Sequence, residues 1–246
     1  MSSVTIFVVM ASLIKAASTE VPPGEAVFFR SFFAIPVILA WLGFQGELPR
    51  GLKTTRPMAH LWRGLVGTGA MGLGFAALGL LPLPEVTAIG YAAPVMVVIL
   101  AAVFLKESIG IFRIGAVTLG LVGVLVVISP RLGVVHSDDA GLTEAIGVAL
   151  VLASAFCAAI AQVTVRTMVR TETTASIVFY FSVTATVLAS LTAPFGWVWP
   201  SPQTIAMLIS AGLLGGIGQI LLTSSYRFAD VSVIAPFEYA SILFAV

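Results

Sequence analysis

Three ionisable side chains lie inside apolar stretches of this sequence, where a charge is costly. Glu238 lies near the end of the chain, and Lys15 and Arg30 lie within its first two apolar stretches. A charged residue at the centre of a membrane-spanning helix costs at least ~2.5 kcal/mol on insertion scales, so it faces a partner, a proton or water. Side chains of this kind can bind a solute or carry a coupling proton.

Glu238 has two interpretations. Counted along a helix that enters the membrane near Asp230, its carboxylate lies about 12 Å deep. There it can exchange a coupling proton, or hold the ammonium or sulfonium of a cationic metabolite. It can equally form a structural ion pair with Arg30 or Lys15.

Lys15 and Arg30 are expected at similar depth. Each lies seven residues from the loop at 22–23, which is about 10 Å along a helix. Their side chains can extend to the membrane interface or pair with Glu20 and Glu25. A role in binding substrate is the alternative.

Four uncharged polar side chains complete the candidate site. Gln162 and Gln219 can form interhelical hydrogen bonds, which contribute roughly 0.6 kcal/mol each, or they can face a cavity. Tyr91 and Tyr239 each lie three residues from a proline within an apolar stretch. Such a proline either kinks the helix or exposes a backbone carbonyl that can bind solute. The predicted substrate-binding or coupling residues are Glu238, Tyr239, Tyr91, Gln162, Gln219, Arg30 and Lys15.

Enzyme chemistry has little support. The sequence contains neither G-x-x-x-x-G-K nor H-E-x-x-H, and its one cysteine, Cys157, has no Cys/His cluster around it. Asp138, Asp139 and Glu144 are the acids available to an intramembrane enzyme acting on lipid, and they are expected in a loop. The sequence therefore predicts no catalytic residue, no metal ligand and no cofactor.

These side chains must be positioned by membrane-spanning helices. Hydrophobic residues make up 59% of the 246 residues and charged residues only 9%, against about 25% charged in soluble domains. The apolar residues recur in blocks about 20 long, the length that spans a bilayer as a helix. Net charge is +1, so the partners expected are the bilayer and a small-molecule substrate, not nucleic acid. The blocks are 4–19, 25–45, 62–82, 85–105, 110–130, 142–165, 174–195, 203–225 and 230–246.

Basic residues predict how these helices are oriented. Nine lie in the even-to-odd loops or at their edges, and Arg131 is the one base in the other loops. The positive-inside rule then places the N-terminus in the cytoplasm and the chain in the inner membrane as a multi-pass protein. The nine are Arg50, Lys53, Arg56, Arg63, Lys106, Arg113, Arg166, Arg170 and Arg227.

Glycines in two of the blocks predict close helix packing. Small residues allow helix backbones to approach closely in lipid. They are Gly64, Gly67, Gly69, Gly72 and Gly74 in the third block and Gly212, Gly215, Gly216 and Gly218 in the eighth.

An internal repeat relates the two halves. A shift of 145 residues aligns Glu85–Ile89 with Asp230–Ile234 and Gly67 with Gly212. Five helices per unit is an odd number, so the units would be inverted, which places a solute site at their interface near the midplane. The predicted units are 1–130 and 142–246, giving an all-α membrane protein. Since the ninth block stops while still apolar, a tenth helix is expected, with about 30 to 40 residues missing.

Four features carry a family resemblance. They are Arg30 in EAVFFRS at 25–31, LPEVTA at 83–88, Pro94 thirteen residues before Glu107, and APFEY at 235–239. The chain resembles the drug/metabolite transporter superfamily in its EamA-type branch. The resemblance implies ten helices in two inverted five-helix units around a central cavity. It also implies secondary transport of small metabolites: amino acids or related compounds, with export as one direction, or uptake of S-adenosylmethionine or riboflavin-like metabolites. Oligomeric state is not implied.

Overall fold

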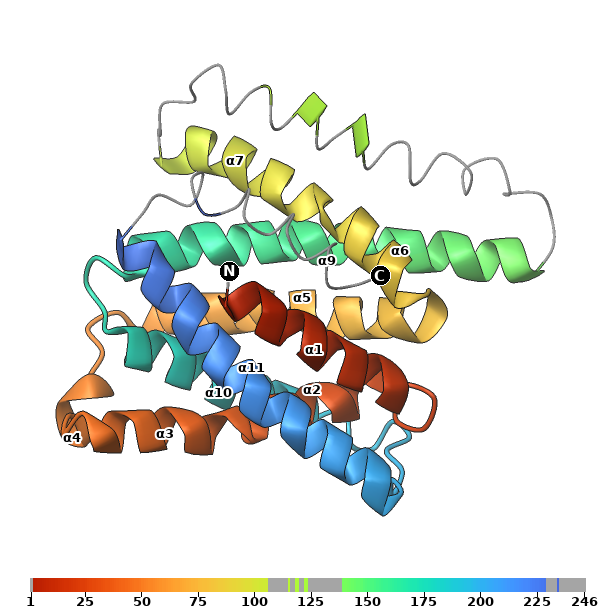
Figure 1. Ribbon diagram of the computed structural model, residues 1–246. Helices are drawn as coiled ribbons and strands as arrows, with labels where there is room; N and C mark the ends of the chain where they lie inside the picture. The colour runs from red at the N-terminus through yellow and green to blue at the C-terminus, as the bar shows by residue number, and fades with distance from the viewer. Residues whose placement is uncertain are drawn as a thin grey trace.

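Every regular element that the structure describes is an α-helix (Figure 1). The computed structural model describes residues 2–105 and 139–228, with positions 115, 118, 119, 122, 123 and 234. Five helical stretches are long and apolar enough to cross a membrane, which confirms the predicted class of all-α, multi-pass membrane protein. They are Pro23–Phe44, Pro57–Leu80, Leu83–Leu105, Gly141–Met168 and Pro202–Phe228, and two shorter apolar helices are Ser2–Ala17 and Thr174–Ser190.

Seven of the nine predicted blocks correspond to these helices, and blocks 110–130 and 230–246 lie outside the described ranges. The helices are α1 (Ser2–Ala17), α2 (Pro23–Phe32), α3 (Ala34–Phe44), α4 (Leu48–Gly51), α5 (Pro57–Leu80), α6 (Leu83–Gly90), α7 (Ala92–Leu105), α9 (Asp139–Met168), α10 (Thr174–Ser190) and α11 (Pro202–Phe228). The prediction of a loop at Asp139 and Glu144 was wrong, because α9 begins at Asp139. An apolar block marks the part of a helix that lies in hydrocarbon, and the helix can extend beyond it, as α9 does at Asp139. Glu144 already lies within the block predicted at 142–165.

Two of the predicted spans are each divided into two helices by a proline. The second span breaks at Phe33, between α2 and α3, and the fourth breaks at Tyr91, between α6 and α7. A proline lacks the N–H that bonds to the carbonyl four residues earlier, and its ring clashes with that carbonyl. For Pro36 that carbonyl belongs to Phe32, the last residue of α2, and Pro94 is likewise four residues after the end of α6. The break before Pro94 agrees with helix kinking, one of the two alternatives stated for that proline. The break before Pro36 was not predicted.

Glycines allow α11 to pack closely on α2 and α3. A Cβ added at Gly212 would lie 2.8 Å from the carbonyl oxygen of Phe29, and one at Gly216 would lie 3.1 Å from the Cα of Ala34. The distance at Gly212 is too short for a Cβ unless the backbone moves, and the distance at Gly216 is tighter than most Cβ contacts. The packing role predicted for this pair is therefore confirmed. It does not extend to Gly69 and Gly72, where an added Cβ would meet nothing within 4 Å.

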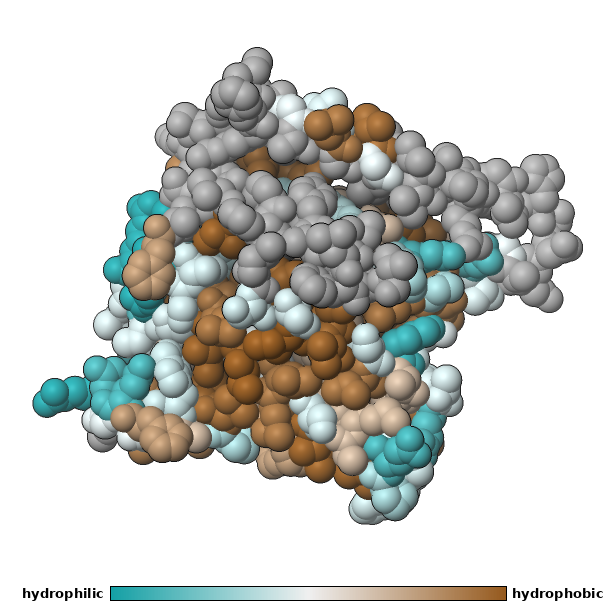
Figure 2. All heavy atoms as spheres, viewed as in Figure 1, coloured by the Kyte–Doolittle hydropathy of each residue, from teal (hydrophilic) through white to brown (hydrophobic). Residues whose placement is uncertain are grey.

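The surface is apolar across its middle. Figure 2 shows hydrophobic residues gathered over the centre of one face, with hydrophilic residues toward its edges. Large apolar side chains such as Phe104, Val103 and Leu191 are 65% exposed or more. Apolar surface this extensive is unsuited to water and suited to lipid.

Two pairs of helices lie side by side, α5 along α9 and α1 along α11 (Figure 1). α10 packs on both α5 and α2. A cavity opens between these six helices, which come from both predicted repeat units.

Candidate functional site

The cavity has a volume of about 240 Å³ and receives side chains from α1, α2, α5, α9, α10 and α11. Most of its lining is apolar, and its polar residues are Arg30, Arg63, Ser154, Gln162 and Gln219. A second cavity of about 310 Å³ shares Gln162 and Leu222 with the first. Apolar walls with a few convergent polar groups are typical of small-molecule sites.

Two buried arginines dominate this cavity. Arg30 on α2 is 3% exposed and Arg63 on α5 is 6% exposed. Both guanidinium groups lie against Phe181 of α10, with Cζ 5.6 Å and 4.1 Å from its ring centroid respectively. An aromatic face attracts a cation, but it supplies no hydrogen-bond acceptor in the ring plane. Within the described part of the chain, Nε and Nη1 of both arginines have no hydrogen-bond partner.

The two arginines reach the middle of the molecule from opposite ends. Arg30 lies seven residues after Pro23, where α2 begins, and Arg63 lies six residues after Pro57, where α5 begins. At about 1.5 Å per residue, each is roughly 10 Å from its own end of a membrane about 30 Å thick. Long side chains cover the remaining distance to Phe181.

Glycines create the space that both guanidinium groups occupy. A Cβ at Gly67, one turn after Arg63, would overlap the Nη1 of Arg63 and lie 2.8 Å from Cε2 of Phe181. A Cβ at Gly215 of α11 would lie 2.9 Å from the Nε of Arg30. These glycines therefore serve the site as well as helix packing.

Three of the predicted site residues line the cavity: Arg30, Gln162 and Gln219. The Oε1 of Gln162 accepts a hydrogen bond of 3.0 Å from the hydroxyl of Tyr226 on α11. Gln162 thus combines the two alternatives stated for it, interhelical bonding and cavity contact. Gln219 is 8% exposed.

Lys15 and Tyr91 do not line this cavity. The Nζ of Lys15 donates to the carbonyl oxygens of Leu78 (2.6 Å) and Leu81 (2.9 Å), at the C-terminal end of α5. The final carbonyls of a helix have no partner within it and carry partial negative charge, so Lys15 caps α5. Tyr91 packs against the hydrophobic cluster around Ile89.

Glu238 and Tyr239 lie outside the described residues. Their roles in substrate binding or proton coupling therefore stay predictions.

Arg63 was missed by the sequence reasoning, which counted it among the charges at a loop edge. The block was taken to begin at residue 62, whereas α5 begins at Pro57. Proline is favoured in the first turn of a helix, and this signal would have placed Arg63 a full turn inside the helix.

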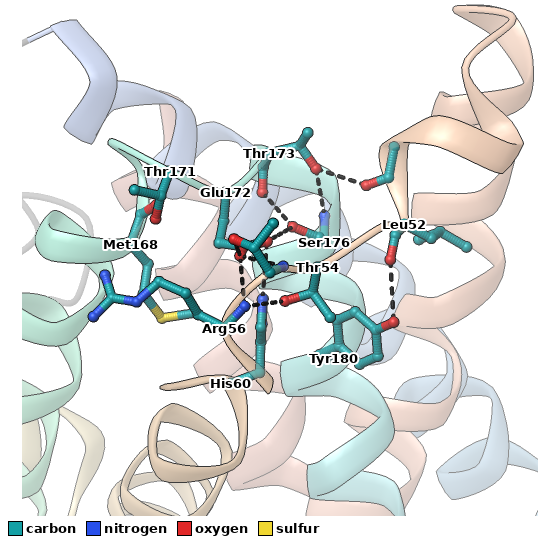
Figure 3. A network of polar contacts seen from close by, with 12 residues as sticks. Leu52, Thr54, Arg56, His60, Met168, Thr171, Glu172, Thr173, Ser176 and Tyr180 are labelled. Carbon is teal, nitrogen blue, oxygen red and sulfur yellow. Dashed lines mark hydrogen bonds and ion pairs between the residues drawn. The ribbon is translucent and has the colours of Figure 1, made fainter. Parts of the chain in front are cut away.

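A polar network closes one end of the helix bundle, around Glu172 in the connection between α9 and α10 (Figure 3). Its Oε1 accepts hydrogen bonds from the backbone N–H of Thr55 (2.9 Å), the Thr55 hydroxyl (2.9 Å) and the backbone N–H of Arg56 (3.1 Å). Its Oε2 lies 3.4 Å from Nε2 of His60. Glu172 therefore caps the N-terminus of α5, where a negative charge is favourable.

Hydrogen bonds decide the ionisation of Glu172. Burial by itself raises the pKa of this carboxyl group, but the hydrogen bonds from Thr55 and the nearby His60 side chain outweigh that effect and lower the pKa to about 2. Glu172 is thus an anion at neutral pH.

A corresponding cap lies at the other end of the bundle. Glu20, in the linker after α1, accepts hydrogen bonds from the backbone N–H of Ser201 and from the hydroxyls of Ser201 and Thr204, at the start of α11. These bonds, led by that of Thr204, lower the pKa of Glu20. Arg56 and Ser201, whose N–H groups are capped, each precede the proline that opens a helix and are 145 residues apart. This is the spacing of the predicted repeat, and each acid caps a helix of the opposite unit.

Comparison with known proteins agrees with this architecture. The EamA-like transporter family matches residues 1–129. An S-adenosylmethionine uptake transporter of Rickettsia conorii is 26% identical over 232 residues, covering 94% of this chain and 75% of that protein. The pseudopaline exporter CntI of Pseudomonas aeruginosa is 29% identical over 245 residues, covering 97% and 80%.

Two further similarities are more distant. A riboflavin transporter of Rhizobium johnstonii is 25% identical over 218 residues, covering 88% of this chain and 68% of that protein. A protein crystal structure shares the fold, with a TM-score of 0.73 at 22% identity over 98% of this chain and 83% of that one. Since the family match covers more than half of a chain whose helices span a membrane, this protein belongs to the EamA-like transporter family.

Proposed function

We propose that this small-metabolite transporter is a secondary transporter of amino acids or related compounds, acting in export from the cytoplasm across the inner membrane. The observation that carries this proposal is the cavity around Arg30 and Arg63, which is lined by six helices from both predicted repeat units. Secondary transporters built from inverted repeats hold their solute at such an interface. The bias of basic residues toward one set of loops supports the inner membrane as location.

The energy for transport is proposed to come from a gradient. The sequence holds no G-x-x-x-x-G-K loop for ATP. Glu238 is the proposed carrier of a coupling proton, because it is an acid deep within a predicted span.

The names of two relatives support uptake, the opposite direction of transport, as well as export. Relatives of similar identity are named as an S-adenosylmethionine uptake transporter and as a pseudopaline exporter. Uptake of S-adenosylmethionine or a riboflavin-like metabolite is therefore the alternative to export of amino acids.

Counterflow in proteoliposomes tests the proposal. Vesicles containing the purified chain are preloaded with one unlabelled solute, and uptake of the same labelled solute is followed for amino acids, S-adenosylmethionine and riboflavin. We expect at least one amino acid or related compound to accumulate above protein-free vesicles. Accumulation of S-adenosylmethionine or riboflavin without any amino acid would support the alternative, and accumulation of none would contradict transport of these classes.

A further inference from the structure

We propose that Arg30 and Arg63 together bind the carboxylate of the transported solute in the cavity beside Phe181. This inference rests on the proposed function, because it assumes that the cavity carries the solute. It assigns a substrate class, carboxylates, and adds Arg63 to the candidate site.

The first argument is unbalanced charge. Two guanidinium groups are more than nine-tenths buried and share one aromatic ring. Among the residues that the structure describes, neither forms an ion pair with an acid. Buried charges are normally paired, because a lone charge away from water is strongly unfavourable. An anion that enters the cavity would satisfy both.

The second argument is hydrogen-bonding capacity. Arg30 and Arg63 each have Nε and Nη1 free of partners within the described part of the chain. Guanidinium groups bind carboxylates through charge-assisted hydrogen bonds, often two at a time. Gly67 and Gly215 let these guanidinium groups lie close against the backbones of α5 and α11.

The rest of the cavity indicates what is attached to the carboxylate. The cavity walls include Met10, Met71 and Phe75, which suit an aliphatic or aromatic body. The Oγ of Ser154 already donates to the carbonyl oxygen of Ala70 (2.7 Å). A hydroxyl has one hydrogen to donate and two lone pairs, so Ser154 is left to accept from a donor such as an ammonium. An amino acid supplies all three groups, which are a carboxylate, an ammonium and an aliphatic or aromatic body. The cavity that would hold it has a volume of about 240 Å³.

Pairs of solutes that differ only by the carboxylate test this site directly. Suitable pairs are phenylalanine with phenethylamine, methionine with 3-(methylthio)propylamine, and S-adenosylmethionine with its decarboxylated form. Thermal unfolding of the purified chain is measured with each compound. We expect the carboxylate member of at least one pair to raise Tm and its decarboxylated partner not to. Stabilisation by inorganic phosphate but by no carboxylate, or equal stabilisation by both members of every pair, would overturn the proposal.

Variants locate the effect. Arg63→Gln and Arg30→Gln should weaken binding of the stabilising carboxylate by at least about tenfold, as expected when a charge-assisted hydrogen-bonded pair is lost. Arg170→Gln, which removes an exposed arginine outside the cavity, should bind as the wild type does. Arg63→Lys keeps the buried charge if the glutamine variant does not fold, and it should bind more weakly than wild type because lysine lacks the planar fork. If the single variants Arg63→Lys and Gly67→Ala both bind the carboxylate with wild-type affinity, Arg63 does not hold it through two hydrogen bonds and the proposal is overturned.

Counterflow separates failure of the site from failure of the proposed function. If a carboxylate solute and its decarboxylated partner accumulate equally, and Arg63→Gln transports both, the protein is a transporter and the carboxylate site is wrong. If carboxylates stabilise the wild type through the arginines but none accumulates, the site stands and amino-acid transport is wrong. If Glu238 neutralises the arginines instead, carboxylates stabilise only the Glu238→Gln variant, which overturns the proposal.

Discussion

At the scale of single residues, this protein uses its charged side chains in two different ways. Lys15 and Glu172 use theirs to satisfy the unpaired backbone groups at the two ends of α5. Arg30 and Arg63 instead direct theirs into a cavity. Helix ends offer a charge fixed partners, whereas the cavity leaves the arginines available to a solute.

A prediction at this scale concerns Glu238. Under the functional interpretation, Glu238→Gln leaves the protein folded and abundant but abolishes transport or its dependence on pH, because the amide cannot take up a proton. Initial rates of counterflow between pH 5 and pH 8 measure this, with Glu47→Gln on the exposed connection before α4 as control. Normal transport by Glu238→Gln over the whole pH range would contradict the coupling role and favour the structural ion pair.

At the scale of elements, helix ends and helix crossings set the structure. Prolines open α2, α5 and α11 and divide two spans, and acids from the opposite unit cap the first residues of α5 and α11. Glycines then set how closely α11 approaches α2 and α3. The caps satisfy backbone N–H groups that have no partner within the helix. The glycines expose the helix backbone, so that a neighbouring helix can approach it closely.

The cap on α5 predicts how stability depends on pH. The pKa of Glu172 is lowered from 4.5 to about 2 in the folded protein. A carboxyl group whose pKa is lower when folded stabilises fully above its unfolded value, and the contribution is lost as pH falls through its folded value. The stabilisation is therefore complete above about pH 4.5 and declines toward pH 2.

Glu172→Gln should lower Tm at neutral pH and remove this part of the acid dependence. Thermal unfolding in detergent at a series of pH values tests both effects. Glu47→Gln is again the matched control. If Glu172→Gln and wild type lose stability in parallel on acidification, the Glu172 cap is not the cause.

The crossing of α11 predicts a steric effect. Gly212→Leu should destabilise the protein by about 1–3 kcal/mol, the usual cost of overpacking, since the carbonyl of Phe29 lies against it. Gly72→Leu is the matched control, because an added Cβ at Gly72 meets nothing within 4 Å. Thermal unfolding of the two variants in detergent should differ clearly, and equal values would show that Gly212 is not at a tight interface.

At the scale of the whole molecule, a different pair of connections is hydrogen-bonded together at each end of the helix bundle. The linker after α1 bonds to the connection before α11, and the segment before α5 bonds to the connection between α9 and α10. Each pair of connections shares one side in the orientation predicted from the basic residues. The contacts are therefore consistent with that orientation.

Cysteine labelling decides between the two sides. In a Cys157→Ser background, a membrane-impermeant thiol reagent added outside the cell should modify Phe195→Cys, whose position is 82% exposed, and spare Lys53→Cys. The reason is the excess of basic residues in the loop that holds Lys53. Labelling of Lys53→Cys alone would reverse the orientation.

The sequence by itself determined the helical class, the approximate position of the described spans and the resemblance to the family. These follow from local quantities, since the length of an apolar block, a proline or a loop charge acts within a few residues of its own position. It also identified Arg30, Gln162 and Gln219 as candidates, because a polar side chain within an apolar block is conspicuous. Tertiary structure alone decided that Arg63 joins them at Phe181, and that Lys15 caps α5 instead. Those outcomes depend on how far each helix is rotated and which neighbour it packs against, and residues 118 positions apart such as Arg63 and Phe181 carry no local signal of their contact.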